Sequence, residues 1–212
     1  MVPHTRLDTL TSAPNNDEVA EMRNVSYRQV VGSLLYLARV PRPDIGFTLN
    51  QLACHCSTPL KQAWDAAVLL RYLSGTQELR LKIRPNEEGL SLATDADFTN
   101  DLEDRKLVSG HVIKLFGTPI AWGSAKQSVV AQSSTAAEFI AADDGLQQAD
   151  WIKLTVDEIL QDIEKPVKVT LFIDNLSTIH RIKKEGSGNA QKAVDIRFHA
   201  LKDAWRHGQM AI

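Results

Sequence analysis

The chain has 212 residues, of which 43 % are hydrophobic, 24 % charged and 6 % aromatic. This balance is typical of a globular protein and excludes collagenous, low-complexity and disulfide-scaffold chains. No apolar run reaches the roughly 18 to 20 residues of a membrane span, and the polar start lacks the apolar core of a signal peptide. We therefore expect an intracellular protein, cytoplasmic or nuclear, with no membrane partner. The formal net charge of −2 gives no overall attraction to phosphate, so nucleic-acid binding would depend on a local patch or on metal ions.

The first 76 residues divide into a polar stretch and a helical stretch. Residues 1–26 mix Thr, Ser, Pro, Asn and acidic residues without apolar periodicity, which predicts a disordered leader or linker. Over residues 27–76, apolar residues recur at three- and four-residue spacing between Pro and Gly interruptions, which predicts a small helical segment. Its three predicted helices lie at 27–39, 43–56 and 59–75.

From residue 77 the pattern is that of a mixed α/β domain, which we place at 77–212. Alternating Leu79, Leu81 and Ile83 predict the start of a β region, and Gly117-Thr118 predicts a hairpin. The strands expected after this start lie near 90–95, 109–116, 119–124 and 167–173. The expected helices lie at 133–165, 176–184 and 191–207. The predicted fold class is α/β, with a three-strand antiparallel meander plus a parallel strand and helices packed on the sheet.

Three acidic residues fall where the predicted elements begin or end. Asp95 lies in the first strand of the meander, Glu138 near the start of the long helix, and Asp174 at the end of the apolar strand. If those two strands are adjacent and parallel, the long helix is the crossover between them, and both aspartates lie at the same edge of the sheet. We therefore expect the three carboxylates to converge.

Each acidic residue also has a purely structural interpretation. Thr135-Ala136-Ala137-Glu138 fits a capping box, in which Glu138 only satisfies backbone N–H groups at the helix start. Asp174 fits the N-cap of the next helix, and Asp95 fits an outward-facing strand residue beside Asp97. The joint arrangement favours a site, because clustered carboxylates repel one another unless a cation such as Mg²⁺ or Mn²⁺ compensates them. Two such metals could support phosphodiester hydrolysis.

Several segments are similar to the C-terminal region of the copia-type LTR retrotransposon Pol polyproteins. The segments are YRQVVGSLLYLARVPRPDIGFTLNQL, AAVLLRYLSGT, TDADFTNDLEDRKLVSGHV, AWGSAKQSVVAQSSTAAEFIA, FIDNLSTI and VDIRFHALKD. In that family a helical connecting segment precedes a ribonuclease H domain. The resemblance implies a ribonuclease H-like fold that cleaves the RNA strand of RNA/DNA hybrids with two divalent metals, Mg²⁺ or Mn²⁺. It makes Asp95, Glu138 and Asp174 the catalytic, metal-binding residues.

The resemblance also implies two partners, and this sequence differs from the family's pattern in two places. The expected partners are an RNA/DNA hybrid and the polymerase part of the same polyprotein, although no Tyr-x-Asp-Asp polymerase motif is present. The family continues into a further strand and an Ala-Asp-x-x-Thr-Lys stretch that carries a fourth metal ligand, whereas this sequence ends at Ile212. We therefore expect a C-terminally truncated domain with an unpaired sheet edge. The alternative function is a non-catalytic remnant with at most weak nucleic-acid binding. Asp97 and Asp195 are secondary candidates for metal binding.

Basic residues outnumber acidic ones, seven against three, between His180 and His207. This stretch is either a track for a nucleic-acid backbone or a solvated helix face. Lys126, Gln127 and Ser128 are further candidates for phosphate contact. The Cys54-His55-Cys56 triplet resembles a metal motif, but residues two apart do not share a helix face, so we expect buried or inert thiols.

Overall fold

The computed structural model describes residues 16–59, 61, 68–97, 107–129, 131, 133–160, 167–184 and 192–212. The chain forms two compact units, and the boundary between them in the sequence lies between Leu81 and Lys82. The described part contains no helix that is both long enough and apolar enough to cross a membrane. Each unit is described by itself.

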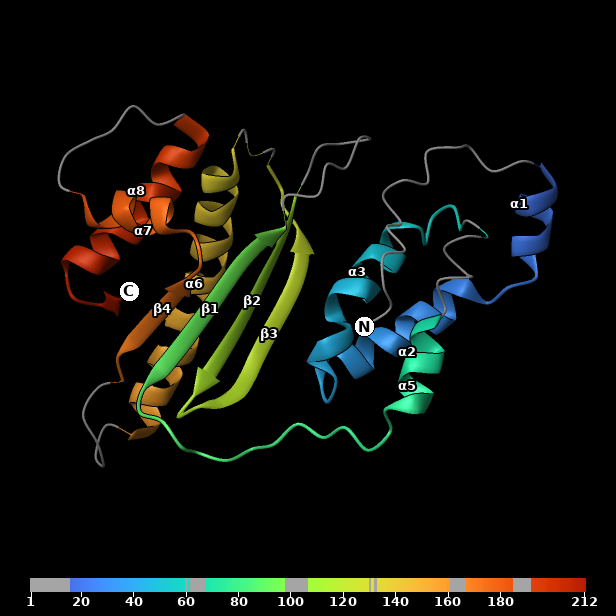
Figure 1. Ribbon diagram of the computed structural model, residues 1–212, viewed down its shortest axis with the longest axis horizontal. Coiled ribbons are helices and arrows are strands. Elements are labelled where there is room, and N and C mark those ends of the chain that lie inside the picture. The colour runs from blue at the N-terminus through green and yellow to red at the C-terminus, as the bar shows by residue number, and fades with distance from the viewer. Residues whose placement is uncertain are drawn as a thin grey trace. The chain divides into compact units, whose positions relative to one another are not determined.

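The first unit is helical (Figure 1). Its elements are α1 (Asn16–Arg23), α2 (Tyr27–Arg39), the 3₁₀ turn η2 (Pro43–Ile45), α3 (Gly46–Cys54) and α5 (Val68–Gly75). The expectation that residues 16–23 lack structure is wrong, because they form α1, and Met22 is buried in the same apolar cluster as Leu34 and Leu49. The remainder of the expected leader, and residues 62–67 of the third predicted helix, lie outside the described residues.

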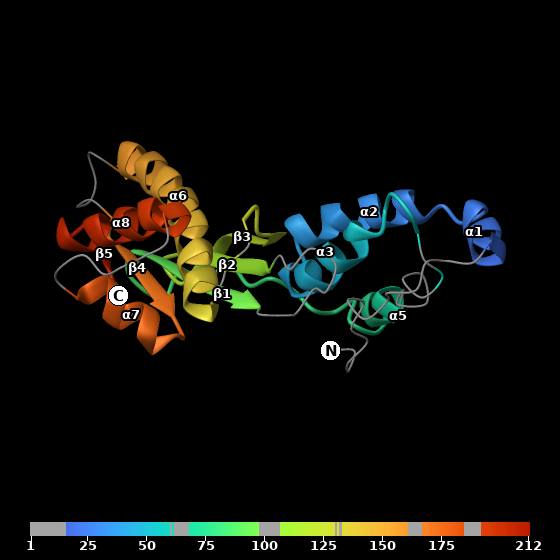
Figure 2. The same cartoon turned by 90° about the horizontal axis from the view of Figure 1, so that it is seen from above.

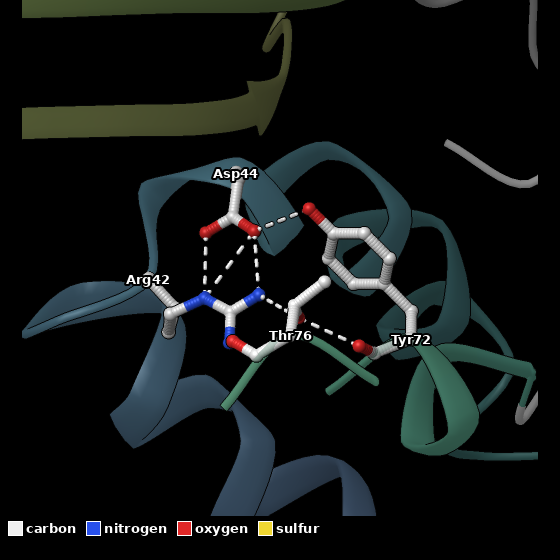
Figure 3. Close-up of polar contacts among 4 residues, drawn as sticks. All are labelled: Arg42, Asp44, Tyr72 and Thr76. Carbon is white, nitrogen blue, oxygen red and sulfur yellow. Dashed lines mark hydrogen bonds and ion pairs between the residues drawn. The ribbon is translucent and has the colours of Figure 1, made fainter. Parts of the chain in front are cut away.

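The nearly buried Arg42 links η2 to the residue that follows α5 (Figure 3). The Arg42 side chain is 10 % exposed and donates to both carboxylate oxygens of Asp44, at 2.9 and 2.8 Å. It also donates to the Oγ1 of Thr76 at 2.8 Å, and the Tyr72 hydroxyl donates to Asp44 at 2.8 Å. The hydrogen bonds from Arg42 lower the pKa of Asp44. The hydrogen bonds from Arg42 to Thr76 and from Tyr72 to Asp44 therefore fasten η2 to the C-terminal end of α5.

The second unit is built on a five-stranded mixed sheet of order β3-β2-β1-β4-β5. Its strands are β1 (Leu90–Asp97), β2 (Val108–Leu115), β3 (Thr118–Lys126), β4 (Val169–Ile173) and β5 (Met210–Ala211). The first three form an antiparallel meander, and β4 is parallel to β1, so the predicted α/β, ribonuclease H-like arrangement is confirmed.

Two expectations about the sheet are wrong. The first is the unpaired edge beside β4, because β5 pairs with β4 in parallel, with Met210 opposite Val169. The second is a β region that begins at residue 79, because residues 77–83 are irregular and the side chains of Leu79 and Ile83 are exposed. Alternation alone predicts a strand only where a partner strand and a buried face are available.

Three helices accompany the sheet, namely α6 (Ser134–Leu160), α7 (Leu176–Lys183) and α8 (Lys192–Arg206). The helix α6 runs along the sheet and contacts β1, β2 and β4, and α8 lies beside it (Figure 2). The close approach of α6 to β1 depends on Gly145, because a Cβ there would lie 3.0 Å from side-chain carbons of Leu92 and Thr94. Buried Leu92, Ile113 and Leu146 form part of the core of this unit.

Candidate metal centre

Asp95 and Asp174 are brought together by the pairing of two neighbouring parallel strands. In the register of β1 and β4, Thr94 is opposite Ile173, so Asp95 and Asp174 are the next residues along the two strands. Both carboxylates are exposed. The N-cap of α7 is Asn175, whose side chain accepts a hydrogen bond from the Thr178 amide at 3.0 Å. The interpretation of Asp174 as this N-cap is therefore wrong, and its carboxylate is not used in capping.

Glu138 reaches the same place from α6. The hydroxyl of Ser133 accepts a hydrogen bond from the Ala136 amide at 3.1 Å, so Ser133 acts as the N-cap and Ala136 occupies the position three residues after it. The capping-box interpretation of Glu138 is therefore wrong, because Glu138 lies two residues too far into the helix. Its carboxylate instead accepts a hydrogen bond from the backbone amide of Ala96 in β1.

The three carboxylates form a compact cluster. One oxygen from each of Asp95, Glu138 and Asp174 can be chosen so that all three lie within 4.8 Å of one another. The two aspartates face solvent, whereas Glu138 is only 6 % exposed. The cluster therefore consists of one buried and two exposed carboxylates.

Burial and charge repulsion act together on Glu138. Burial is the largest effect and the carboxylates of Asp174 and Asp95 add to it, which raises the pKa of Glu138 from 4.5 to about 7. The hydrogen bond from the Ala96 amide acts in the opposite direction and is the weaker effect. Ionised Glu138 is therefore costly in this place unless positive charge approaches it.

The residues present fit a divalent cation. The Oε2 atom of Glu138 is buried and has no hydrogen-bond partner, which is the condition of an oxygen that a cation could satisfy. All three groups are carboxylates, and hard cations such as Mg²⁺ prefer oxygen ligands. The three carboxylates would therefore be the residues that hold such an ion.

Of the two secondary candidates, only Asp97 can be compared with this cluster. Asp97 lies two residues along β1 and is outside the group of three, while the side chain of Asp195 lies outside the described residues. Gln127 is 2 % exposed, so the expectation that it meets phosphate at the surface is wrong. Cys54 is exposed rather than buried, and both cysteines are free thiols.

The basic stretch near the C-terminus is not one continuous surface. Arg197 pairs with Asp144 at 2.6 Å and with Asp143 at 3.7 Å on α6, and Lys202 is buried. The side chains of Arg181 and Lys184, on α7 and just after it, are exposed. Basic and acidic residues that the sequence separates are thus partly paired between α8 and α6.

Two groups that shape the cluster were not predicted from the sequence. The Ala96 amide carries no side-chain signal, so only the fold can place it against Glu138. Asn175 was detectable, because an Asn three residues before Thr178 at the start of a predicted helix is a standard N-cap pattern.

The sheet order and the carboxylate cluster define a ribonuclease H-like domain with a candidate cation site. Two solved RNase H structures each align with the chain at a TM-score of 0.40. An RNase H domain from Mycobacterium tuberculosis is 11 % identical and aligns over 57 % of this chain and 77 % of its own. LC11-RNase H1 in complex with an RNA/DNA hybrid is 12 % identical and aligns over 57 % and 81 %.

No protein-family model matches the chain, but its sequence is similar to segments of much longer proteins. The Pol polyprotein of transposon TNT 1-94 from Nicotiana tabacum is 30 % identical over 94 % of this chain, and that of transposon RE2 from Arabidopsis thaliana is 28 % identical over 88 %. Homologues of the chain are thus retrovirus-related Pol polyproteins of plant transposons, and the chain spans only 15 % and 13 % of the length of these two. The secreted RxLR effector protein 161 of Plasmopara viticola is 38 % identical over 62 % of this chain and 94 % of its own length.

Proposed function

We propose that residues 77–212 are a metal-dependent endonuclease domain that cleaves the RNA strand of RNA/DNA hybrids, and that residues 27–76 are the helical connecting segment before it. The observation that carries the proposal is the convergence of Asp95, Glu138 and Asp174, with oxygens within 4.8 Å of one another and an unpartnered buried oxygen on Glu138. The homology to Pol polyproteins supports a nucleic-acid substrate.

The residues of the proposed site have different roles, because Glu138 is buried and the two aspartates are exposed. Asp95, Glu138 and Asp174 would hold the cations. The chemistry that a bound pair of Mg²⁺ or Mn²⁺ ions supplies is activation of water and stabilisation of the leaving oxygen. Glu138 accepts a hydrogen bond from the Ala96 amide, which favours one orientation of its carboxylate before any ligand arrives. The exposed aspartates lie where a phosphodiester can approach from solvent.

Positive charge for the substrate backbone is available on the element that follows Asp174. The helix α7 begins two residues after Asp174, and the exposed Arg181 and Lys184 lie in its last turn and at its C-cap. At a rise of about 1.5 Å per residue, these cations are on the order of 10 Å along the helix from the carboxylates. This distance lets them contact backbone phosphates beside the one that is cleaved.

The proposal is tested by incubating the purified chain with an RNA/DNA hybrid that carries different labels on its two strands, with Mg²⁺ or Mn²⁺. We expect cleavage of the RNA strand only. Asp95→Asn should abolish it, whereas Glu158→Gln, which removes an exposed carboxylate from the same helix as Glu138, should leave it unchanged.

Two results would contradict the proposal. If the wild-type chain cleaves no faster than Asp95→Asn, the domain is not an endonuclease under these conditions. Hybrid binding without cleavage, measured on the same samples, would then favour the alternative of a non-catalytic nucleic-acid-binding domain. Equal cleavage of both strands would contradict the proposed substrate.

A further inference from the structure

Gln127 is a buried amide at the point where β3 ends and the chain turns towards α6. Its side chain is 2 % exposed, and its backbone amide donates to the Leu107 carbonyl at 2.7 Å. Its side-chain Nε2 donates to the Ser109 hydroxyl of β2 at 2.8 Å and to the Ala137 carbonyl of α6 at 3.0 Å. One side chain therefore links the sheet to the first turns of the long helix.

The orientation of this amide follows from its partners. The Ala137 carbonyl only accepts hydrogen bonds, so the amide nitrogen and not the oxygen must face it. Both N–H groups of Gln127 are then used, and its Oε1 is buried without a partner. Burying an acceptor without a partner costs free energy, and an apolar side chain at this position would avoid that cost. What this side chain contributes is therefore its pair of donated hydrogen bonds.

The two acceptors of Gln127 lie next to the candidate metal centre. Ala137 directly precedes Glu138 in α6, and Ser109 is opposite Ala96 in the register of β1 and β2. Ala96 is the residue whose amide holds the Glu138 carboxylate. The contacts form a closed ring that runs from Glu138 to Ala96, across the strands to Ser109, through Gln127 to Ala137, and back to Glu138.

We infer that Gln127 is a positioning residue that fixes the depth at which α6 presents Glu138 to Asp95 and Asp174. The inference rests on the proposed function only where it concerns cation binding. Without the link, the start of α6 still packs in an apolar cluster through Ala137 and Ile140. Such apolar contacts restrict sliding less than two directed hydrogen bonds do. Residues that orient metal ligands through such contacts typically change metal affinity by about 10- to 100-fold.

The test measures the affinity for Mn²⁺ alone, without substrate, in Gln127→Met, Ser109→Ala and the double variant. Methionine keeps the length of the side chain and removes both donors. We expect Gln127→Met to weaken Mn²⁺ binding by about tenfold or more, and Ser109→Ala by about threefold. The double variant should be no weaker than Gln127→Met, because the shared contact is already lost. Ile113→Val, a core change in β2, lowers stability without touching the ring and should leave Mn²⁺ affinity unchanged.

Wild-type Mn²⁺ affinity in Gln127→Met would overturn the inference, and if that variant does not fold, wild-type affinity in Ser109→Ala would do so. If the wild-type chain itself binds no Mn²⁺, the proposed metal site is wrong. The role of Gln127 is then tested by melting temperatures measured without metal. Glu138→Gln should raise the melting temperature by relieving repulsion from Asp95 and Asp174. If Gln127 holds Glu138 in place, that rise should fall to about half or less in the Gln127→Met background. An undiminished rise would overturn the inference.

Discussion

Replacing Glu138 by glutamine should stabilise the metal-free protein at pH 8. The carboxylate is buried beside two others, and its pKa in the folded protein is about 7 against an ordinary 4.5. Between those values the folded state holds a proton that the unfolded state has lost, so the free energy of unfolding falls as the pH rises through this window. Above pH 7 the full cost is present, and below 4.5 it is absent.

The magnitude follows from the same two values. A tenfold change in proton affinity corresponds to about 1.4 kcal/mol, so the change from 4.5 to about 7 gives at most about 3 kcal/mol. Glutamine has nearly the same shape and keeps an oxygen that can accept from the Ala96 amide. We therefore expect a gain of about 2 to 3 kcal/mol at pH 8, or roughly 4 to 12 °C in melting temperature for a chain of this size.

The assay is urea unfolding in EDTA at pH 8 and at pH 4.5. The readout is the unfolding transition of the second unit, which is the sheet domain. Glu158→Gln is the matched control and should change stability by less than about 0.5 kcal/mol at either pH. If Glu138→Gln does not raise the free energy of unfolding at pH 8, or raises it equally at both pH values, the ionised Glu138 carboxylate does not destabilise the folded protein and the reasoning is refuted.

Three further outcomes test other parts of the structure. Mg²⁺ should raise the melting temperature of the wild-type chain at pH 8 in a concentration-dependent way, because it binds the folded state, and Asp174→Asn should abolish the rise. Gly145→Val should destabilise the sheet domain by about 1 to 3 kcal/mol, because side-chain carbons of Leu92 and Thr94 already lie 3.0 Å from a Cβ there. Gly32→Ala, with nothing within 4 Å, should not destabilise the helical unit in the same thermal scan. Arg42→Ala should cost that unit about 3 kcal/mol in urea, whereas Arg80→Ala, in an exposed pair, should cost less than about 0.5.

The three carboxylates could be selected from the sequence because each lies at a boundary between elements. Asp95 and Asp174 follow the apolar residues of strands that the crossover helix makes parallel neighbours, so strand order alone brings them together. Which residue caps which helix is decided by a shift of one or two positions. Sequence patterns define helix starts no better than that, so only the structure shows that Ser133 and Asn175, and not Thr135 and Asp174, cap the two helices.

Other features depend on contacts between distant segments. Arg197 is neutralised by Asp143 and Asp144, more than fifty residues earlier, so counting charges along the C-terminal stretch overestimated its positive surface. The short strand β5 has no alternation of its own and exists because β4 offers an edge to pair with. Gln127 looks like a surface residue in the sequence, and its burial follows from the packing of α6 on the meander.

The central claim is that Asp95, Glu138 and Asp174 together hold a divalent cation. A crystal soaked in Mn²⁺ tests it most directly, because the anomalous signal of the metal locates the ion independently of the protein atoms. The account predicts anomalous density within coordination distance of all three carboxylates, and its loss in Asp174→Asn. Mn²⁺ bound elsewhere on the sheet domain, with no density at this cluster, would contradict it.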